Sequence, residues 1–273
     1  MTSPLLPKKV RTAHLAEFKQ AGQKFSCLTS YDQLTAGIFD EAGIEVILVG
    51  DSAADNALGY DTTLPISVDE MIPFGRAVAG AVSRGLVVVD MPFGSYELSA
   101  EQALENAIRI MKQTGADAVK LEGGTRSVDQ IKAITTAGIP VMAHIGFTPQ
   151  SVNNLGGFKV QGRGEGADAL LEDAKAVAEA GAFAVVLELV PAELAKQVTD
   201  TCGIPTIGIG AGPDTDGQIL VWTDFAGLSS HKPKKFVKQY AQLREMLVSA
   251  AQSYRAEVAS GAFPEASRSF GEN

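Results

Sequence analysis

The sequence is poor in the residues that mark disulfide-rich and zinc-binding proteins. Only two cysteines and three histidines occur among its 273 residues. The cysteines, Cys27 and Cys202, lie far apart and lack the spacing of a metal-binding motif, which argues against a cysteine-built zinc site. Unpaired cysteines in such small number are typical of a reducing compartment, so we expect a cytoplasmic protein.

Long apolar runs and an excess of positive charge are also missing. No stretch reaches the roughly 18 uninterrupted apolar residues of a membrane helix. The first residues, MTSPLLPKKVRT, lack the long apolar core of a signal peptide or anchor. The net charge of −9 argues against general nucleic-acid binding. We therefore expect a soluble protein that binds neither membranes nor nucleic acids.

The sequence does contain a regular alternation of short apolar runs and helix-like segments. Strands are predicted at residues 24–30, 45–51, 86–92, 117–123, 139–146, 183–189 and 204–212. Several of the helix-like segments between them end in glycine, as helix C-caps do. Strands that are apolar on both faces and alternate with helices indicate parallel βαβ units.

Seven such units without a change in composition favour a single (β/α)₈ TIM barrel over an open sheet. The eighth strand is expected within residues 219–225. A helix at 11–22 is predicted to close the barrel bottom. Apolar residues at helical spacing predict a long amphipathic helix at about 234–260, packed on the barrel or on a neighbouring subunit. The whole chain, 1–273, is thus expected to form one domain, with the barrel at about 24–230.

The predicted strands end in polar residues, although their interiors are apolar. In barrels of this class the catalytic groups lie at the carboxyl ends of the strands. The side chains expected at this rim are Asp51, Asp90, Lys120, Glu122, His144 and Glu188. Lys120 and Glu122 are two residues apart, so they share one face of their strand. Burying charges there requires a partner or a bound ligand.

Each of these residues alone has an ordinary structural interpretation. An aspartate after a strand often caps the next helix, and Glu188 could pair with a lysine. His144 alone would more often be a hydrogen-bonded core histidine than a metal ligand. As a group, however, four carboxylates face one lysine, and like charges ~4 Å apart repel by ~4 kcal/mol at an effective dielectric of ~20. The cluster therefore predicts a cation, and oxygen ligands without cysteine favour Mg²⁺.

Two glycine-rich loops suggest further contacts. Residues 146–166 carry many glycines and no periodicity, which is typical of a lid or binding loop. Within it, Lys159 and Arg163 either meet an anionic ligand or are simply solvated. The stretch GIGAG (208–212) permits close backbone approach to a phosphate, although such a short pattern is weakly specific.

Longer motifs across the chain resemble the ketopantoate hydroxymethyltransferase family. The resemblance runs from LTSYD (28–32) to GQILVW (217–222). It is carried by LVGDS (48–52), GYDTTLP (59–65), VDMPFGSY (89–96), VKLEGG (119–124), AHIGFTPQSVNNLGGFKVQGRG (143–164), LELVPAEL (187–194) and IGIGAGPDTDGQIL (207–220). One departure follows LVGDS, where many members carry a Leu-Gly-Met-like run and this chain has AADNA (53–57).

The resemblance implies a fold, a reaction and a set of site residues. The family is a (β/α)₈ barrel that transfers a hydroxymethyl group from 5,10-methylenetetrahydrofolate to 3-methyl-2-oxobutanoate, giving 2-dehydropantoate for pantothenate synthesis. It uses one Mg²⁺ per subunit and is typically a homodecamer of two pentameric rings. The family's metal ligands fall on Asp51, Asp90 and Glu122, its keto-acid contacts on Asp51, Ser52, Asp90 and Lys120, and its proton acceptor on Glu188. His144 is then expected beside a metal ligand.

Three other classes of protein remain to be weighed. Mg²⁺-dependent enzymes of the isocitrate lyase and phosphoenolpyruvate mutase type also carry a GDS-like rim on the second strand. Many of them use a catalytic cysteine in a mobile loop, and neither Cys27 nor Cys202 is placed for that. A flavin or phosphate barrel built on GIGAG leaves the carboxylates unexplained. A non-catalytic scaffold would carry a costly polar rim for no purpose.

Overall fold

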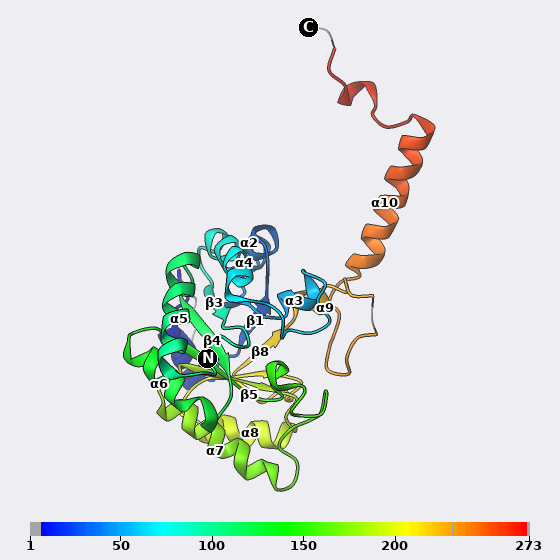
Figure 1. The fold of residues 1–273 in the computed structure, drawn as a ribbon. Helices are drawn as coiled ribbons and strands as arrows, with labels where there is room; N and C mark the ends of the chain where they lie inside the picture. The colour runs from blue at the N-terminus through cyan, green and yellow to red at the C-terminus, as the bar shows by residue number, and fades with distance from the viewer. Residues whose placement is uncertain (1–6, 231, 272–273) are drawn as a thin grey trace. The chain divides into compact units, whose positions relative to one another are not determined.

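The computed structural model describes residues 7–230 and 232–271. Part of the N-terminal segment that we expected not to be a signal peptide, residues 1–6, lies outside this range. In the described chain, eight parallel strands close into a barrel in sequence order, each paired with the next and the last paired with the first (Figure 1). The predicted (β/α)₈ fold class is therefore confirmed.

The strands fall close to their predicted places, except the eighth. They are β1 (Phe25–Thr29), β2 (Val46–Val49), β3 (Leu86–Asp90), β4 (Ala118–Glu122), β5 (Val141–Gly146), β6 (Ala184–Glu188), β7 (Thr206–Ile209) and β8 (Gly217–Leu220). The prediction of a strand at 219–225 was wrong beyond Leu220, because Trp222–Phe225 is the short helix α9. Short apolar runs do not distinguish strand from helix by periodicity. Gly217 begins β8 where a β-carbon would lie 2.4 Å from the ring of Phe25.

Helices follow the strands and surround the barrel. They are α1 (Thr12–Ala21), α2 (Gln33–Glu41), α3 (Ala53–Asn56), α4 (Val68–Ala81), α5 (Ala100–Thr114), α6 (Val128–Thr136), α7 (Gly166–Glu179) and α8 (Ala192–Thr201). Local sequence explains several of their ends. The Asp32 carboxylate caps α2, Ser67 and Glu70 form a capping box on α4, and Gly115 ends α5 in the left-handed conformation.

The barrel interior is a closed apolar core below the polar rim. It consists of Phe25, Cys27, Val46, Leu48, Leu86, Val88, Ala118, Met142, Ala184, Val186, Ile207 and Ile219. From α1, Leu15 and Phe18 belong to the same cluster and are fully buried, so the predicted helix does close one end of the barrel. Because side chains alternate along a strand, the interior face continues upward through Asp90, Lys120 and His144.

The chain divides after Val221 into two compact units, and the second contains α9, α10 (Leu243–Ser260) and a 3₁₀ turn at Ala266–Arg268. The helix predicted from 234 begins only at Leu243. The preceding segment is held in an irregular form, since the Tyr240 ring stacks on Phe225 with centroids 5.1 Å apart and the Tyr240 N–H donates to the Phe225 carbonyl. A single domain over 1–273 stays a prediction. Among the described helices, none is both long and apolar enough to cross a bilayer.

Candidate active site

The six polar side chains predicted at the rim are all buried at one end of the barrel. Asp51 lies two residues after β2, and the others lie within the final residues of β3 to β6. The residues are Asp51, Asp90, Lys120, Glu122, His144 and Glu188. Strand register places Asp90 beside Lys120 and Glu122 beside His144. Side chains far apart in the sequence are thus brought to one site.

A buried ion pair joins β3 and β4. Lys120 Nζ lies 2.5 Å from Asp90 Oδ1, and the Asp51 N–H donates to the other Asp90 oxygen at 3.1 Å. Burial raises the pKa of Asp90, despite the lysine beside it. Burial alone would lower the pKa of Lys120, but the carboxylates of Asp90, Glu122 and Asp51 outweigh it and raise that pKa. Lys120 is therefore charged, and the carboxylates around it explain how a lysine side chain is accommodated within a buried strand.

The surroundings of Asp51 disfavour the ionised form of its carboxyl group. Burial, followed by the charges of Asp90 and Glu122, raises its pKa to about 8. Its Oδ2 accepts a hydrogen bond from Gln150 Nε2 at 2.9 Å. At neutral pH this carboxyl group binds a proton unless a cation takes the proton's place.

His144 lies between two carboxylates. Its Nδ1 is 3.4 Å from Glu122 Oε1 and its Nε2 is 3.5 Å from Glu188 Oε2. These are ion-pair contacts at long range, because neither ring nitrogen makes a well-formed hydrogen bond among the described residues. Burial and Lys120 lower the pKa of the imidazole, but the two carboxylates outweigh them and raise it to about 9. His144 thus lies beside a predicted metal ligand, as expected for a supporting residue.

Ser52 and Glu188 are both held by their neighbours. The Ser52 hydroxyl lies 2.7 Å from the hydroxyl of the buried Tyr31.

The backbone just after Glu188 makes a sharp turn. Leu189 has φ of 50°, which is an unfavourable left-handed conformation for a leucine. Its N–H donates to the Ile209 carbonyl and its own carbonyl accepts from the Gln161 N–H. These bonds maintain the sharp turn of the chain just beyond Glu188.

Sequence reasoning missed three neutral residues of this site. Gln150 contacts the carboxylates of Asp51 and Glu122. The Tyr96 hydroxyl donates to Gln150 Oε1 and accepts from the Glu122 backbone N–H, and Tyr31 contacts Ser52. All three lie in loops or turns just after β5, β3 and β1, within motifs that carried the family resemblance. Their place at the carboxyl ends of strands was the available signal.

The donor set fits a hard divalent cation such as Mg²⁺. Glu122 Oε1 is a buried carboxylate oxygen without a hydrogen bond, and Asp51 has a pKa that a cation would lower. No three histidine, cysteine or acidic side chains of the described chain converge into a complete metal-binding group. Mg²⁺ does not require one, because it usually keeps several waters and takes one or two carboxylates from the protein.

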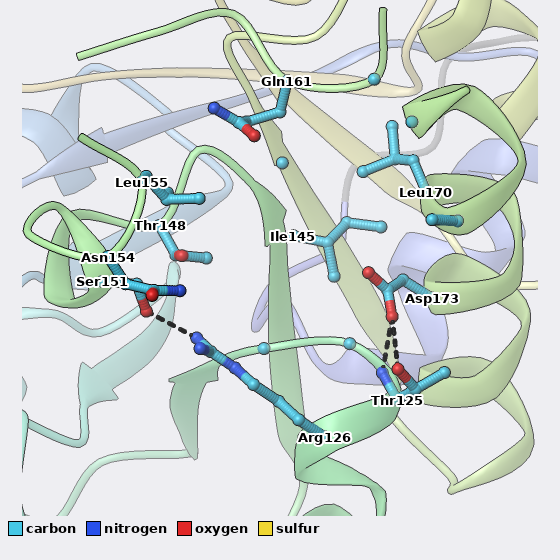
Figure 2. A pocket seen from close by; sticks show the side chains of 16 residues that line it. Thr125, Arg126, Ile145, Thr148, Ser151, Asn154, Leu155, Gln161, Leu170 and Asp173 are labelled. Atoms are coloured by element: carbon cyan, nitrogen blue, oxygen red, sulfur yellow. Dashed lines mark hydrogen bonds between the residues drawn. The ribbon is translucent and has the colours of Figure 1, made fainter. Parts of the chain in front are cut away.

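A separate cavity of about 320 Å³ lies beside the site (Figure 2). It is lined by the loops after β4 and β5 and by α7, and Ile145 borders it from the face of β5 opposite to His144. Arg126 Nη2 donates to Ser151 Oγ at 2.7 Å across it, and Asp173 accepts from Thr125. None of the six rim residues borders this cavity.

The glycine-rich loops take conformations that local packing explains. Between β5 and α7, residues 147–165 contain the 3₁₀ turn η2 (Pro149–Ser151) and no other helix or strand. Lys159 and Arg163 are exposed. Gly212 has φ of 79°, and a β-carbon there would lie 2.5 Å from that of Ala192, so close packing requires this glycine. Within the departure at 53–57, Ala53–Asn56 forms the short helix α3.

A closed (β/α)₈ barrel with buried carboxylates, a lysine and a histidine at the carboxyl ends of its strands defines a class, the barrel enzymes whose active site lies at that end. The comparisons give the family. A family model described as ketopantoate hydroxymethyltransferase matches residues 9–266, and the chain belongs to that family.

Relatives agree with this assignment. A 3-methyl-2-oxobutanoate hydroxymethyltransferase of Leifsonia xyli subsp. xyli is 61% identical over 97% of this chain and 95% of its own length. The protein of that name from Mycobacterium bovis (strain BCG / Pasteur 1173P2) is 60% identical over 96% and 93%. The predicted family, the enzyme class and the predicted function in ketopantoate synthesis are therefore confirmed.

Solved structures share the fold at low identity. Phosphonopyruvate hydrolase, in complex with oxalate and Mg²⁺, aligns with a TM-score of 0.61 and 14% identity over 94% of this chain and 93% of that one. A 2,3-dimethylmalate lyase, described as a phosphoenolpyruvate mutase/isocitrate lyase superfamily member, aligns with 0.59 and 16% over 96% and 92%. Neither cysteine is suited to the chemistry expected of the lyase rival, because burial raises the pKa of both Cys27 and Cys202.

Proposed function

We propose that this chain uses Mg²⁺ and 5,10-methylenetetrahydrofolate to convert 3-methyl-2-oxobutanoate into 2-dehydropantoate and tetrahydrofolate. Overall, the C3–H bond of the keto acid breaks and a bond from C3 to the donor's methylene carbon forms. Both C–N bonds that tie this carbon to the folate nitrogens break, water supplies the hydroxyl group, and the two nitrogens end with the proton from C3 and one proton from water, as tetrahydrofolate. The observation that carries the proposal is the buried cluster of Asp51, Asp90, Lys120 and Glu122 at the end of a barrel whose relatives carry this activity in their names.

Asp51, Asp90 and Glu122 would hold the Mg²⁺, one or two of them directly and the rest through bound water. When bound, the ion supplies Lewis-acid polarisation of the keto group, which acidifies the C3 proton. Lys120 is charged and buried, so it neutralises negative charge on the keto acid at short range in a low-dielectric site. Ser52, held by Tyr31, donates to the substrate carboxylate.

Glu188 is the proton acceptor in this proposal. It ends β6 on the same interior face as the cluster, and His144 Nε2 contacts its Oε2. A charged His144 between Glu188 and Glu122 balances part of their negative charge and keeps the two carboxylates apart. From the end of β6, two strands along the barrel from β4, Glu188 would remove the C3 proton.

An assay of 2-dehydropantoate formation tests the function. With the keto acid, methylenetetrahydrofolate and Mg²⁺, we expect product by mass spectrometry. We also expect EDTA to abolish turnover and excess Mg²⁺ to restore it. Phosphonopyruvate and isocitrate in place of the keto acid test the lyase alternative. Consumption of either, without 2-dehydropantoate formation from the keto acid, would sink the proposal.

We propose a homodecamer of two pentamers, as is typical of the family. The 18-residue helix α10 supports association with further copies, since none of its residues is buried in the described chain. It exposes Met246, Leu247, Tyr254 and Val258. Light scattering is expected to give ten times the 28.6 kDa of one chain. A monomeric mass at micromolar concentration would contradict this assembly. A cytoplasmic location is likewise proposed, and two buried free cysteines fit its reducing conditions.

A further inference from the structure

We propose that Gln150 is a positioning residue that orients Asp51 and Glu122 for the cation by holding one oxygen of each carboxylate. The inference rests on the metal site of the proposed function. Gln150 lies in the 3₁₀ turn η2 after β5, and only 4% of its surface is exposed. It neither belongs to the predicted rim nor carries charge, so its role depends entirely on its hydrogen bonds.

The side-chain amide of Gln150 is fully satisfied in a single orientation. Its Nε2 donates to Asp51 Oδ2 at 2.9 Å and to the Met91 carbonyl at 3.1 Å. Its Oε1 accepts from the Tyr96 hydroxyl at 2.5 Å. An amide turned by 180° would set an oxygen against the carboxylate and the carbonyl, so the network admits only this orientation.

The backbone of the same residue holds the second carboxylate. The Gln150 N–H donates to Glu122 Oε2 at 3.0 Å, and the Tyr96 hydroxyl accepts from the Glu122 N–H at 3.2 Å. These bonds take up Oδ2 of Asp51 and Oε2 of Glu122. Glu122 Oε1 stays buried without a hydrogen bond, with His144 Nδ1 3.4 Å away. On Asp51, Gln150 Nε2 donates to Oδ2 and not to Oδ1. One residue therefore decides which oxygens of two carboxylates remain for a cation.

An amide is suited to this position because it donates without adding charge. A lysine or arginine here would neutralise Asp51 and compete with the cation for it. Hydrogen bonds from neutral groups to metal-ligating carboxylates fix their orientation, and their loss typically weakens metal binding by roughly 10- to 100-fold.

The neighbouring residue provides a matched control. Ser151 lies in the same 3₁₀ turn, but its hydroxyl lines the separate cavity beside α7 and accepts from Arg126 Nη2 there (Figure 2). Ser151→Ala therefore removes one hydrogen bond of η2 without touching a carboxylate. Tyr96→Phe removes the hydroxyl that orients the amide, together with the acceptor of the Glu122 N–H, and leaves the Gln150 side chain in place.

The test is a calorimetric titration with Mn²⁺ alone, without keto acid or folate, together with the metal-free melting temperature. Gln150→Met is expected to weaken Mn²⁺ binding by roughly 10- to 100-fold and to raise the Mg²⁺ concentration needed for half-maximal rate. Tyr96→Phe is expected to show a smaller loss of the same kind. Ser151→Ala is expected to match the parent. A purely structural role would lower the melting temperature and leave the affinity of the folded protein unchanged.

Mn²⁺ affinity of folded Gln150→Met within a factor of about two of the parent overturns the inference, while leaving the proposed function intact. If Gln150→Met does not fold, Tyr96→Phe decides by the same criterion. An equal loss of affinity in Ser151→Ala also overturns it, because the effect would then belong to the turn and not to the amide. A parent protein that binds no Mn²⁺ overturns the proposed metal site and the inference together.

Discussion

Glu122→Gln is expected to lower kcat/KM by about a thousandfold while the protein stays folded. The change keeps the size of the side chain, and its amide oxygen can still accept from the Gln150 N–H. It removes the charge of a buried carboxylate whose Oε1 has no hydrogen bond within the described part of the chain. Lewis-acid stabilisation is worth several kcal/mol, and each ~1.4 kcal/mol changes a rate tenfold.

Steady-state kinetics at increasing Mg²⁺, with circular dichroism for the fold, measure this effect. Glu179→Gln is the matched control, since Glu179 is exposed on α7 and its Oε1 lies 3.8 Å from Lys175 Nζ in a surface ion pair. The control is expected to keep full activity. Normal turnover of Glu122→Gln at saturating Mg²⁺ would show that Glu122 is not a metal ligand.

Glu188→Ala is expected to lower kcat by roughly 10²- to 10⁴-fold, the usual contribution of a general base. The keto acid is held by other residues in this proposal, so its KM should change little. The direct measurement is exchange of the C3 proton of 3-methyl-2-oxobutanoate in D₂O by NMR, without the folate. That exchange is expected to fall in parallel with kcat.

Glu188→Gln distinguishes the loss of the base from the loss of side-chain volume, because the amide fills the same space and cannot accept the proton. Both variants are expected to lose exchange equally. Glu193→Gln, on the exposed surface of α8, is the control. If exchange continues at the parent rate in both Glu188 variants, this residue does not form the enolate, and it acts on another proton of the reaction.

Much of the architecture could be predicted because burial on both faces leaves a strong signal. The runs that became β1 to β7 are continuous and apolar, and each is followed by a polar rim residue or a turn. The segment ILVWTDF (219–225) carried no such signal, since an apolar run of that length suits either a strand or a helix. The start of α10 was missed because the stacking of Tyr240 on Phe225 outweighed the helical spacing of the preceding residues.

The charged members of the site could be predicted for a related reason. A charge at the end of an apolar strand is costly, so Lys120 and Glu122 pointed to a partner or a ligand. Neutral residues carry no such penalty. Gln150, Tyr96 and Tyr31 therefore looked like ordinary loop residues. In the structure Gln150 holds two carboxylates, Tyr96 orients the Gln150 amide, and Tyr31 contacts Ser52. Predictions of site residues from charge alone find the groups that react and overlook those that orient them.

The sequence by itself determined the alternation of strands and helices, the barrel, and the family with its charged groups, because strand periodicity and the cost of buried charge are local properties. Tertiary structure alone decided that Lys120 pairs with Asp90 and that His144 lies between Glu122 and Glu188. It also decided which carboxylate oxygens Gln150 occupies. Hydrogen bonds have a short range and a fixed direction. Such choices therefore exist only after closure of the barrel brings polar atoms from distant parts of the chain within about 3 Å of one another.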